Sequence, residues 1–125
     1  MRFAIGFADV ASYVLPRMRR YILDGKTPVP EDNLEIWGPF MGDIEKRRVA
    51  RTELGAGVFI STVFLGLDYA WPWESHRPIL FETTIFGGKH DGWMERYSTW
   101  EEASRGHTRA VAKCGWKLIR GGKYD

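Results

Sequence analysis

The sequence predicts a single α+β domain, in which a small antiparallel sheet of three to five strands packs against a long C-terminal helix. The length of 125 residues is typical of one domain with one hydrophobic core. Two strand-like segments, residues 47–53 and 58–67, flank the turn Leu54-Gly55-Ala56-Gly57 and indicate a hairpin. Ser98-Thr99-Trp100-Glu101 has the capping-box pattern that begins a helix. One or two short helices are expected before the sheet.

Residues 3–15 are mostly apolar and follow Arg2, so a signal peptide and a membrane span both have to be considered. Asp9 interrupts this run, and Pro16-Arg17-Met18-Arg19-Arg20 stands where a cleavage site of small residues would be needed. The run is also far shorter than the roughly twenty residues that span a bilayer. We therefore expect residues 1–20 to be a variable extension with a short helix, in a protein that makes no membrane contact.

The next segment combines a short strand with a short helix. Tyr21-Ile22-Leu23 has strand character, and Asp24-Gly25 suits a tight turn. Three apolar residues then recur at helical spacing: Leu34, Trp37 and Met41. Gly38-Pro39 should stop or kink this helix after about two turns, so its stability should depend on packing through Trp37.

The segment 58–67 is apolar on both faces, which is typical of a central strand that is covered on both sides. Residues 78–86 form the next predicted strand, in which Glu82 shares a face with apolar neighbours. Residues 94–97 are a candidate edge strand. The residues expected in the core are Phe64, Leu65, Phe81, Ile85, Trp100 and Val111.

The C-terminal helix is predicted between Thr99 and Cys114, and Gly115 can end it. Its inward residues recur at helical spacing: Trp100, Ala103, His107, Ala110, Val111 and Cys114. Residues 21–113 thus form the expected core of the domain. Residues 114–125 are expected to be a tail that adds a strand at 116–119 or frays.

Composition limits the class of function. Hydrophobic residues make up 44% of the chain and eighteen residues are aromatic, so a packed interior is expected. The net charge of +2 is too balanced to indicate a polyanionic partner, and we interpret the local basic clusters as solvated surface. Cys114 is the only cysteine, which excludes an intrachain disulfide and a paired-cysteine zinc site and fits a reducing cytoplasm.

The loop 68–77 is unusual because it carries Tyr69, Trp71 and Trp73, where small polar residues are the norm. Large aromatics beside Arg77 can stack on a base or anchor a protein partner. They can equally form a lid over the core, since tryptophans are usually buried. Both interpretations remain open at the level of sequence.

Asp68 and Glu82 form a candidate acidic pair for a divalent cation or for acid and base chemistry, and Glu53 could join them. The preferred interpretation of Glu82 is an ion pair with Arg51, Arg77 or Arg96. The three histidines have no metal-binding spacing, so no metal or cofactor is predicted. Gly87-Gly88-Lys89-His90 could contact a phosphate, but a hairpin turn is favoured.

Five segments occur in an order and spacing that resemble a small protein family of tailed phages and prophages. They are Arg51-Thr52-Glu53, the stretch Ser61-Thr62-Val63-Phe64-Leu65-Gly66-Leu67-Asp68, Leu80-Phe81-Glu82-Thr83, Phe86-Gly87-Gly88, and Arg96-Tyr97-Ser98-Thr99-Trp100-Glu101-Glu102-Ala103 with Gly106-His107. The family often has Asp-His where this chain has Asp68-Tyr69. The resemblance implies a phage origin, and it transfers no catalytic residue.

Because small phage accessory proteins act mostly by binding, the leading hypothesis is a binding protein rather than an enzyme. It would inhibit or evade a system of the bacterial host, in the host cytoplasm, by blocking a host protein or sequestering a nucleotide-like ligand. The expected contact surface is Tyr69, Trp71, Trp73, Arg77 and Arg96. A nucleotide-processing enzyme that uses Asp68 and Glu82 with a divalent cation is the first alternative, and a virion structural or assembly protein is the second. A homo-oligomer is compatible with each.

Overall fold

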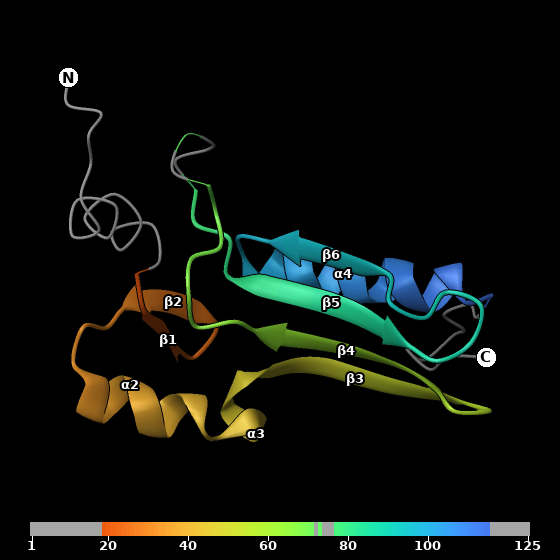
Figure 1. Cartoon of the computed structure of the whole chain (residues 1–125), viewed down its shortest axis with the longest axis horizontal. Coiled ribbons are helices and arrows are strands. Elements are labelled where there is room, and N and C mark those ends of the chain that lie inside the picture. The colour runs from red at the N-terminus through yellow and green to blue at the C-terminus, as the bar shows by residue number, and fades with distance from the viewer. Residues whose placement is uncertain (1–18, 72, 74–76, 116–125) are drawn as a thin grey trace, which may run out of the picture.

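The computed structural model describes residues 19–71, 73 and 77–115 (Figure 1). Within them a four-stranded antiparallel sheet has the order β3-β4-β5-β6. Its strands are β3 (Arg48–Gly55), β4 (Val58–Phe64), β5 (Phe81–Phe86) and β6 (Met94–Tyr97). The helix α4 (Trp100–Lys113) lies across one face and contacts all four strands. The predicted α+β fold is thereby confirmed, while the predictions for residues 1–18 and 116–125 fall outside the described residues.

The segment that precedes this sheet forms a small unit at one end of it (Figure 1). The unit consists of β1 (Tyr21–Asp24), β2 (Thr27–Pro30), α2 (Leu34–Met41) and α3 (Ile44–Arg47). The sequence did not predict β2, because Pro28 and Pro30 lack the amide donors of a central strand. They are tolerated since β2 pairs only with β1. Among the described residues, no helix combines the length and the apolar character that a membrane crossing requires.

Gly66, just beyond β4, joins this small unit to the sheet. Its carbonyl accepts hydrogen bonds from the Tyr21 amide at 2.9 Å and from the Trp37 indole at 3.0 Å. Trp37 therefore holds α2 in place, as the sequence predicts. Gly66 has a φ of 75°, and a Cβ there would overlap with the side chain of Met41, so glycine is required.

The core lies between the sheet and α4. Alternate residues of β4 and β5 point toward the helix and are fully buried: Ile60, Thr62, Phe64, Phe81, Thr83 and Ile85. Phe81 packs edge-on against Phe64 and Trp100, with ring centroids 5.3 and 6.3 Å apart. Of the predicted core residues, Leu65 and Trp100 are only half-buried. Trp100 still packs on the core, whereas Leu65 directly follows the inward-facing Phe64, and successive strand residues point to opposite faces.

We call the opposite face of the sheet the open face, and it is turned toward the viewer in Figure 1. It carries Arg51 of β3, Phe59, Ser61 and Val63 of β4, Glu82, Thr84 and Phe86 of β5, and Met94 and Arg96 of β6. β4 is interior, as predicted, but no helix or strand of the described residues covers this second face. Neighbouring side chains shield it instead, because Phe59 stacks on Phe86 at 4.7 Å and the guanidinium of Arg51 lies 4.1 Å from the Phe59 ring.

The capping box of α4 is one residue further along than predicted. Thr99, not Ser98, is the N-cap, and its hydroxyl accepts from the Glu102 amide at 3.1 Å. The Glu102 carboxylate accepts in return from the Thr99 amide at 3.1 Å. Because Ser98 with Glu101 and Thr99 with Glu102 both fit the pattern, the sequence motif could not distinguish the two registers.

A row of buried polar groups crosses the core beneath α4. His107 is 3% exposed, and its Nδ1 and Nε2 lie 2.7 and 2.8 Å from the hydroxyls of Thr62 and Thr52. Thr62 continues the row to Thr83 at 2.6 Å. Burial lowers the pKa of His107 to about 4, so the ring is neutral and can donate from one nitrogen and accept at the other. His107 thus ties α4 to the sheet by hydrogen bonds, as its place on the helix suggested.

Candidate binding surface

The loop between β4 and β5 is held at its base by Asp68. This carboxylate is only 4% exposed, and its Oδ1 accepts from the amides of Ala70 at 2.8 Å and Ile79 at 2.9 Å. The Asp68 amide itself donates to the Arg19 carbonyl at 3.1 Å. A buried carboxylate is tolerated when it is hydrogen-bonded, and here it joins the two ends of the loop. Asp68 therefore has a structural role that the sequence did not reveal.

Trp71 and Trp73 stand above this base as a stacked pair. Their ring centroids are 5.1 Å apart and their planes differ by 17°. Trp71 is 59% exposed and Trp73 is 77% exposed. Rings that are exposed to this extent contribute little to the packing of the core, and large apolar side chains grouped at the surface typify an interaction site. These two exposures favour recognition over the lid interpretation.

Tyr69 and Arg96 connect the loop to the open face of the sheet. The guanidinium of Arg96 lies 4.7 Å from the centre of the Tyr69 ring, a cation–π distance. Its Nε donates to Oε2 of Glu82 at 2.8 Å, which is one of the three ion pairs considered for Glu82. Tyr69 is 39% exposed, so it adds an accessible ring below the tryptophan pair.

Arg77 fixes the second end of the loop to the start of α4. Its Nη2 donates to Oε1 of Glu102 at 2.8 Å, the same carboxylate that closes the capping box. Partial burial opposes ionisation of Glu102, but the hydrogen bonds from Arg77, Ser98 and Thr99 prevail and lower its pKa. The loop is thus held by Asp68 at its base and by Arg77 at the helix.

The candidate acidic pair has different partners at its two members. Asp68 is engaged by backbone amides, and Glu82 by Arg96. In the part of the chain that the structure describes, no group of three or more His, Cys, Asp or Glu side chains is placed to hold a metal ion. The enzyme alternative therefore has no third ligand for a divalent cation among these residues.

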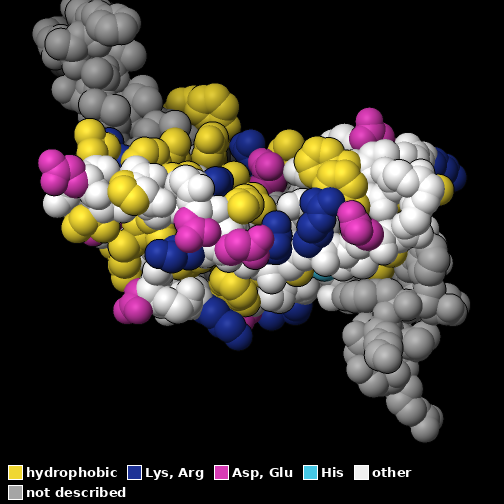
Figure 2. Space-filling model, turned by 90° about the horizontal axis from the view of Figure 1, so that it is seen from below, with side chains coloured by type: hydrophobic (Ala, Val, Ile, Leu, Met, Phe, Trp, Pro, Cys, Tyr) yellow, Lys and Arg dark blue, Asp and Glu magenta, His cyan; other side chains and the backbone are white. Residues whose placement is uncertain are grey.

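Charges across the sheet are balanced pair by pair. The five ion pairs of the described residues all use arginine: Arg48 with Glu45, Arg51 with Glu53, Arg77 with Glu102, Arg96 with Glu82 and Arg109 with Glu95. Figure 2 views the molecule from the side of β3 and the short helices, and it shows basic and acidic side chains interspersed. A basic groove for a polyanion is not a feature of this side. Arg47 departs from the interpretation of the basic clusters as solvated surface, because it is partly buried and donates to the carbonyls of Phe64 and Met41, each at 3.1 Å.

The sequence identified the aromatic residues of the loop but missed the open face. The signal for it was present, because Phe59 and Phe86 occupy outward positions of two adjacent strands.

Comparison with models of protein families, with curated proteins and with solved structures finds no match to this chain. Its function therefore has to be inferred from its own residues.

Proposed function

We propose that this chain is a binding protein whose aromatic loop, Tyr69, Trp71 and Trp73 with Arg77 and Arg96, recognises another protein. The observation that carries the proposal is the stacked and exposed pair of tryptophans on a loop with a fixed base. Tryptophan and tyrosine are enriched among the residues that dominate binding energy at protein interfaces. Because Asp68 and Arg77 already fix the two ends of the loop, less conformational entropy is lost there on binding.

A protein partner is favoured over a nucleotide-like ligand by the state of the two arginines. Arg96 donates to Glu82 and Arg77 donates to Glu102, so a phosphate would compete with a carboxylate at each position. Each tryptophan also covers one face of the other, which removes the open slot between rings that a base would enter. An apolar or uncharged side chain of a protein can pack on the exposed surface of Trp73 without either cost.

With the resemblance to phage proteins, this surface suggests an accessory protein that docks on a host protein in the bacterial cytoplasm and blocks it. The resemblance supports the origin, and the exposed loop supports the mode of action. Inhibition would follow from steric coverage, because the chain needs only to occupy a functional surface of its target. Neither catalysis nor assembly into a virion is required by the groups found at the loop.

The proposal is tested by affinity capture from bacterial lysate with three forms of the chain. The first is the natural sequence, and the second carries Trp71→Ala and Trp73→Ala. The matched control carries Leu34→Ala and Ile36→Ala on α2, where the side chains are 59% and 48% exposed. We expect mass spectrometry to find a protein that the natural chain and the control retain and the tryptophan variant loses.

Two results would contradict the proposal. If the tryptophan variant retains the same proteins as the natural chain, the loop is not the contact surface. If the natural chain retains a nucleotide-like small molecule, and the tryptophan variant loses that molecule but no protein, the loop binds a ligand of the second class. Mass spectrometry of both proteins and small molecules in the eluate distinguishes these outcomes.

A further inference from the structure

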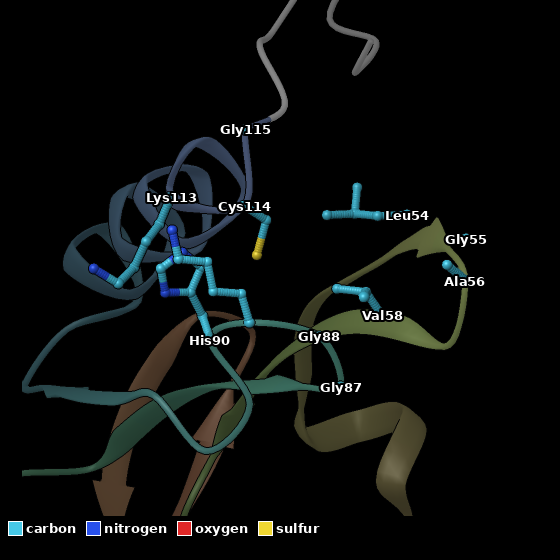
Figure 3. Close-up of a pocket in the computed structure, with 11 residues that line it drawn as sticks. Leu54, Gly55, Ala56, Val58, Gly87, Gly88, His90, Lys113, Cys114 and Gly115 are labelled. Carbon is cyan, nitrogen blue, oxygen red and sulfur yellow. The ribbon is translucent and has the colours of Figure 1, made fainter.

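A pocket of about 420 Å³ lies at the end of the sheet where the turn between β3 and β4, the loop between β5 and β6 and the end of α4 meet (Figure 3). Pockets that bind small molecules have volumes of roughly 300 to 1,000 Å³, so this pocket has the size for a small ligand. The residues of the aromatic loop do not line it. The pocket and the proposed contact surface are therefore separate sites.

The floor of this pocket is formed by two turns that contain glycine, and their backbones lie close to each other. Gly87 has a φ of 84°, and a Cβ there would overlap with the carbonyl oxygen of Gly57. Gly88 has a φ of 71°, and a Cβ there would come within 2.9 Å of Val58 Cγ2. Because only glycine combines these dihedral angles with this spacing, the turns and the pocket between them are defined by the backbone.

The side chains around the pocket divide into a cationic side and an apolar side. In Figure 3, Lys113, His90 and Cys114 lie together on one side, and Leu54 and Val58 lie across the pocket from them. Lys89 also belongs to the lining, whose described residues include no aspartate and no glutamate. A pocket of this kind suits an anion that carries an apolar body.

The two lysines of this pocket are not paired with carboxylates among the described residues. Within the described residues neither Lys89 nor Lys113 forms an ion pair, whereas five arginines do. Lys113 lies 5.7 Å from the centre of the Trp93 ring, which orients its side chain without neutralising it. Among the described residues, an anion in the pocket would thus displace no carboxylate from either lysine.

The C-terminal end of a helix disfavours anions because its last carbonyl groups carry partial negative charge. Here several of them are already occupied. The Cys114 amide donates to the carbonyls of Ala110 and Val111, and the Gly115 amide donates to that of Ala112. The unfavourable contribution of α4 is reduced in this way, and Lys113 in its last turn opposes what remains.

We propose that this pocket binds a phosphate monoester of an aromatic or apolar group. The phosphate would contact Lys89 and Lys113, with His90 beside them, and the apolar body would pack against Leu54 and Val58. The glycine amides contribute less than in a phosphate-binding loop, because the Gly87 amide already donates to Asp91 Oδ1 at 2.7 Å. Recognition would therefore come from side chains rather than from the backbone amides of the glycine-rich segment.

Cys114 provides the readout, since it is the only cysteine of the chain and it lines the pocket. We would follow its alkylation by iodoacetamide with intact-protein mass spectrometry, with and without AMP or phenyl phosphate. The matched controls each carry one half of a probe. Adenosine and phenol carry the aromatic body without phosphate, and inorganic phosphate carries the anion alone. At nine-tenths occupancy, AMP or phenyl phosphate should slow the reaction by about tenfold, because only unoccupied protein reacts. Each half alone should protect less.

The variant Lys89→Ala with Lys113→Ala should lose this protection, and Lys26→Ala with Lys46→Ala, outside the pocket, should keep it. Protection is measured for each variant as the ratio of its alkylation rates with and without probe. This ratio cancels any effect of the substitutions on the intrinsic reactivity of the Cys114 thiol. The proposal is overturned if neither phosphate monoester slows alkylation at millimolar concentration. It is also overturned if adenosine protects as well as AMP, or if the double lysine variant is protected like the natural chain. The Trp71 and Trp73 variant should keep full protection, so this test is independent of the aromatic loop.

Discussion

Two regions of the molecule differ in the kind of side chain that they bury. They are the face of the sheet beneath α4 and the loop between β4 and β5. Under α4 the large apolar residues are fully buried, and the polar side chains of His107, Thr62 and Thr83 bond to one another. In the loop the polar residue Asp68 is buried and the tryptophans are exposed. The contrast indicates that stability resides mainly in the first region, and the proposed function assigns binding to the second. Substitutions should therefore separate the two properties.

The largest effect on stability should come from Phe81→Ala. Phe81 is fully buried and packs on Phe64 and Trp100, so its truncation should lower the free energy of unfolding by about 3 to 5 kcal/mol. Phe86→Ala is the matched control, because Phe86 lies on the same strand, points to the open face and is 41% exposed. It should cost no more than about 1 kcal/mol. Urea denaturation of both variants measures this, and equal losses would show that the two faces do not differ as described.

The next effect is a loss of stability in acid that depends on His107. Its pKa is about 4 in the folded protein against 6.5 for an unperturbed histidine, so the unfolded chain takes up the proton first. Stability is then complete above pH 6.5 and falls as the pH is lowered toward 4, by about 3 kcal/mol in total.

Urea denaturation between pH 7 and pH 4.5 measures this loss. Glu95, whose pKa the hydrogen bond from Arg109 lowers, contributes mainly below its ordinary value of 4.5. His107→Gln should flatten the dependence on pH above 4.5, and an unchanged slope in this variant would assign the loss to other groups.

A smaller effect is expected at the contact of α4 with β6. A Cβ at Gly106 would overlap with the hydroxyl group of Tyr97, so Gly106→Ala should destabilise the protein by about 1 to 3 kcal/mol. At Gly38 in α2 nothing lies within 4 Å of the added Cβ. Gly38→Ala should therefore be neutral or stabilising by up to about 1 kcal/mol. Thermal unfolding of the pair gives the comparison, and a stabilised Gly106→Ala variant would mean that Tyr97 can move aside at little cost.

The sequence was sufficient to predict the architecture because local patterns determine it. The apolar period of β4 and β5 and the pattern of helix α4 depend on residues close together in the chain. The open face could not be predicted in the same way. Apolar residues on both sides of β4 indicated two covering layers, but Arg51 and Phe86 from neighbouring strands provide the second cover. The contact of Phe59 with Phe86 joins residues that are far apart in the sequence.

The binding role of the loop residues stays a prediction, but their geometry could not be predicted from the sequence. Tyr69, Trp71 and Trp73 were recognised because aromatic residues are unusual in a loop. Their presentation depends on Asp68, which bonds to the amide of Ile79 eleven residues away. The sequence suggested a chemical role for this carboxylate, since no local pattern distinguishes an acid that closes a loop from one that holds a metal.

The smallest effect on stability should come from Trp71→Ala with Trp73→Ala, and this variant tests the central claim most directly. With a captured partner in purified form, the measurement is its Kd for the natural chain and for the variant, together with the melting temperature of each. We predict that the Kd rises by about thirtyfold or more, as expected for the loss of interface residues worth at least 2 kcal/mol, while the melting temperature changes by no more than a few degrees. An unchanged Kd, or a variant that unfolds, would contradict the separation of binding from folding on which the account rests.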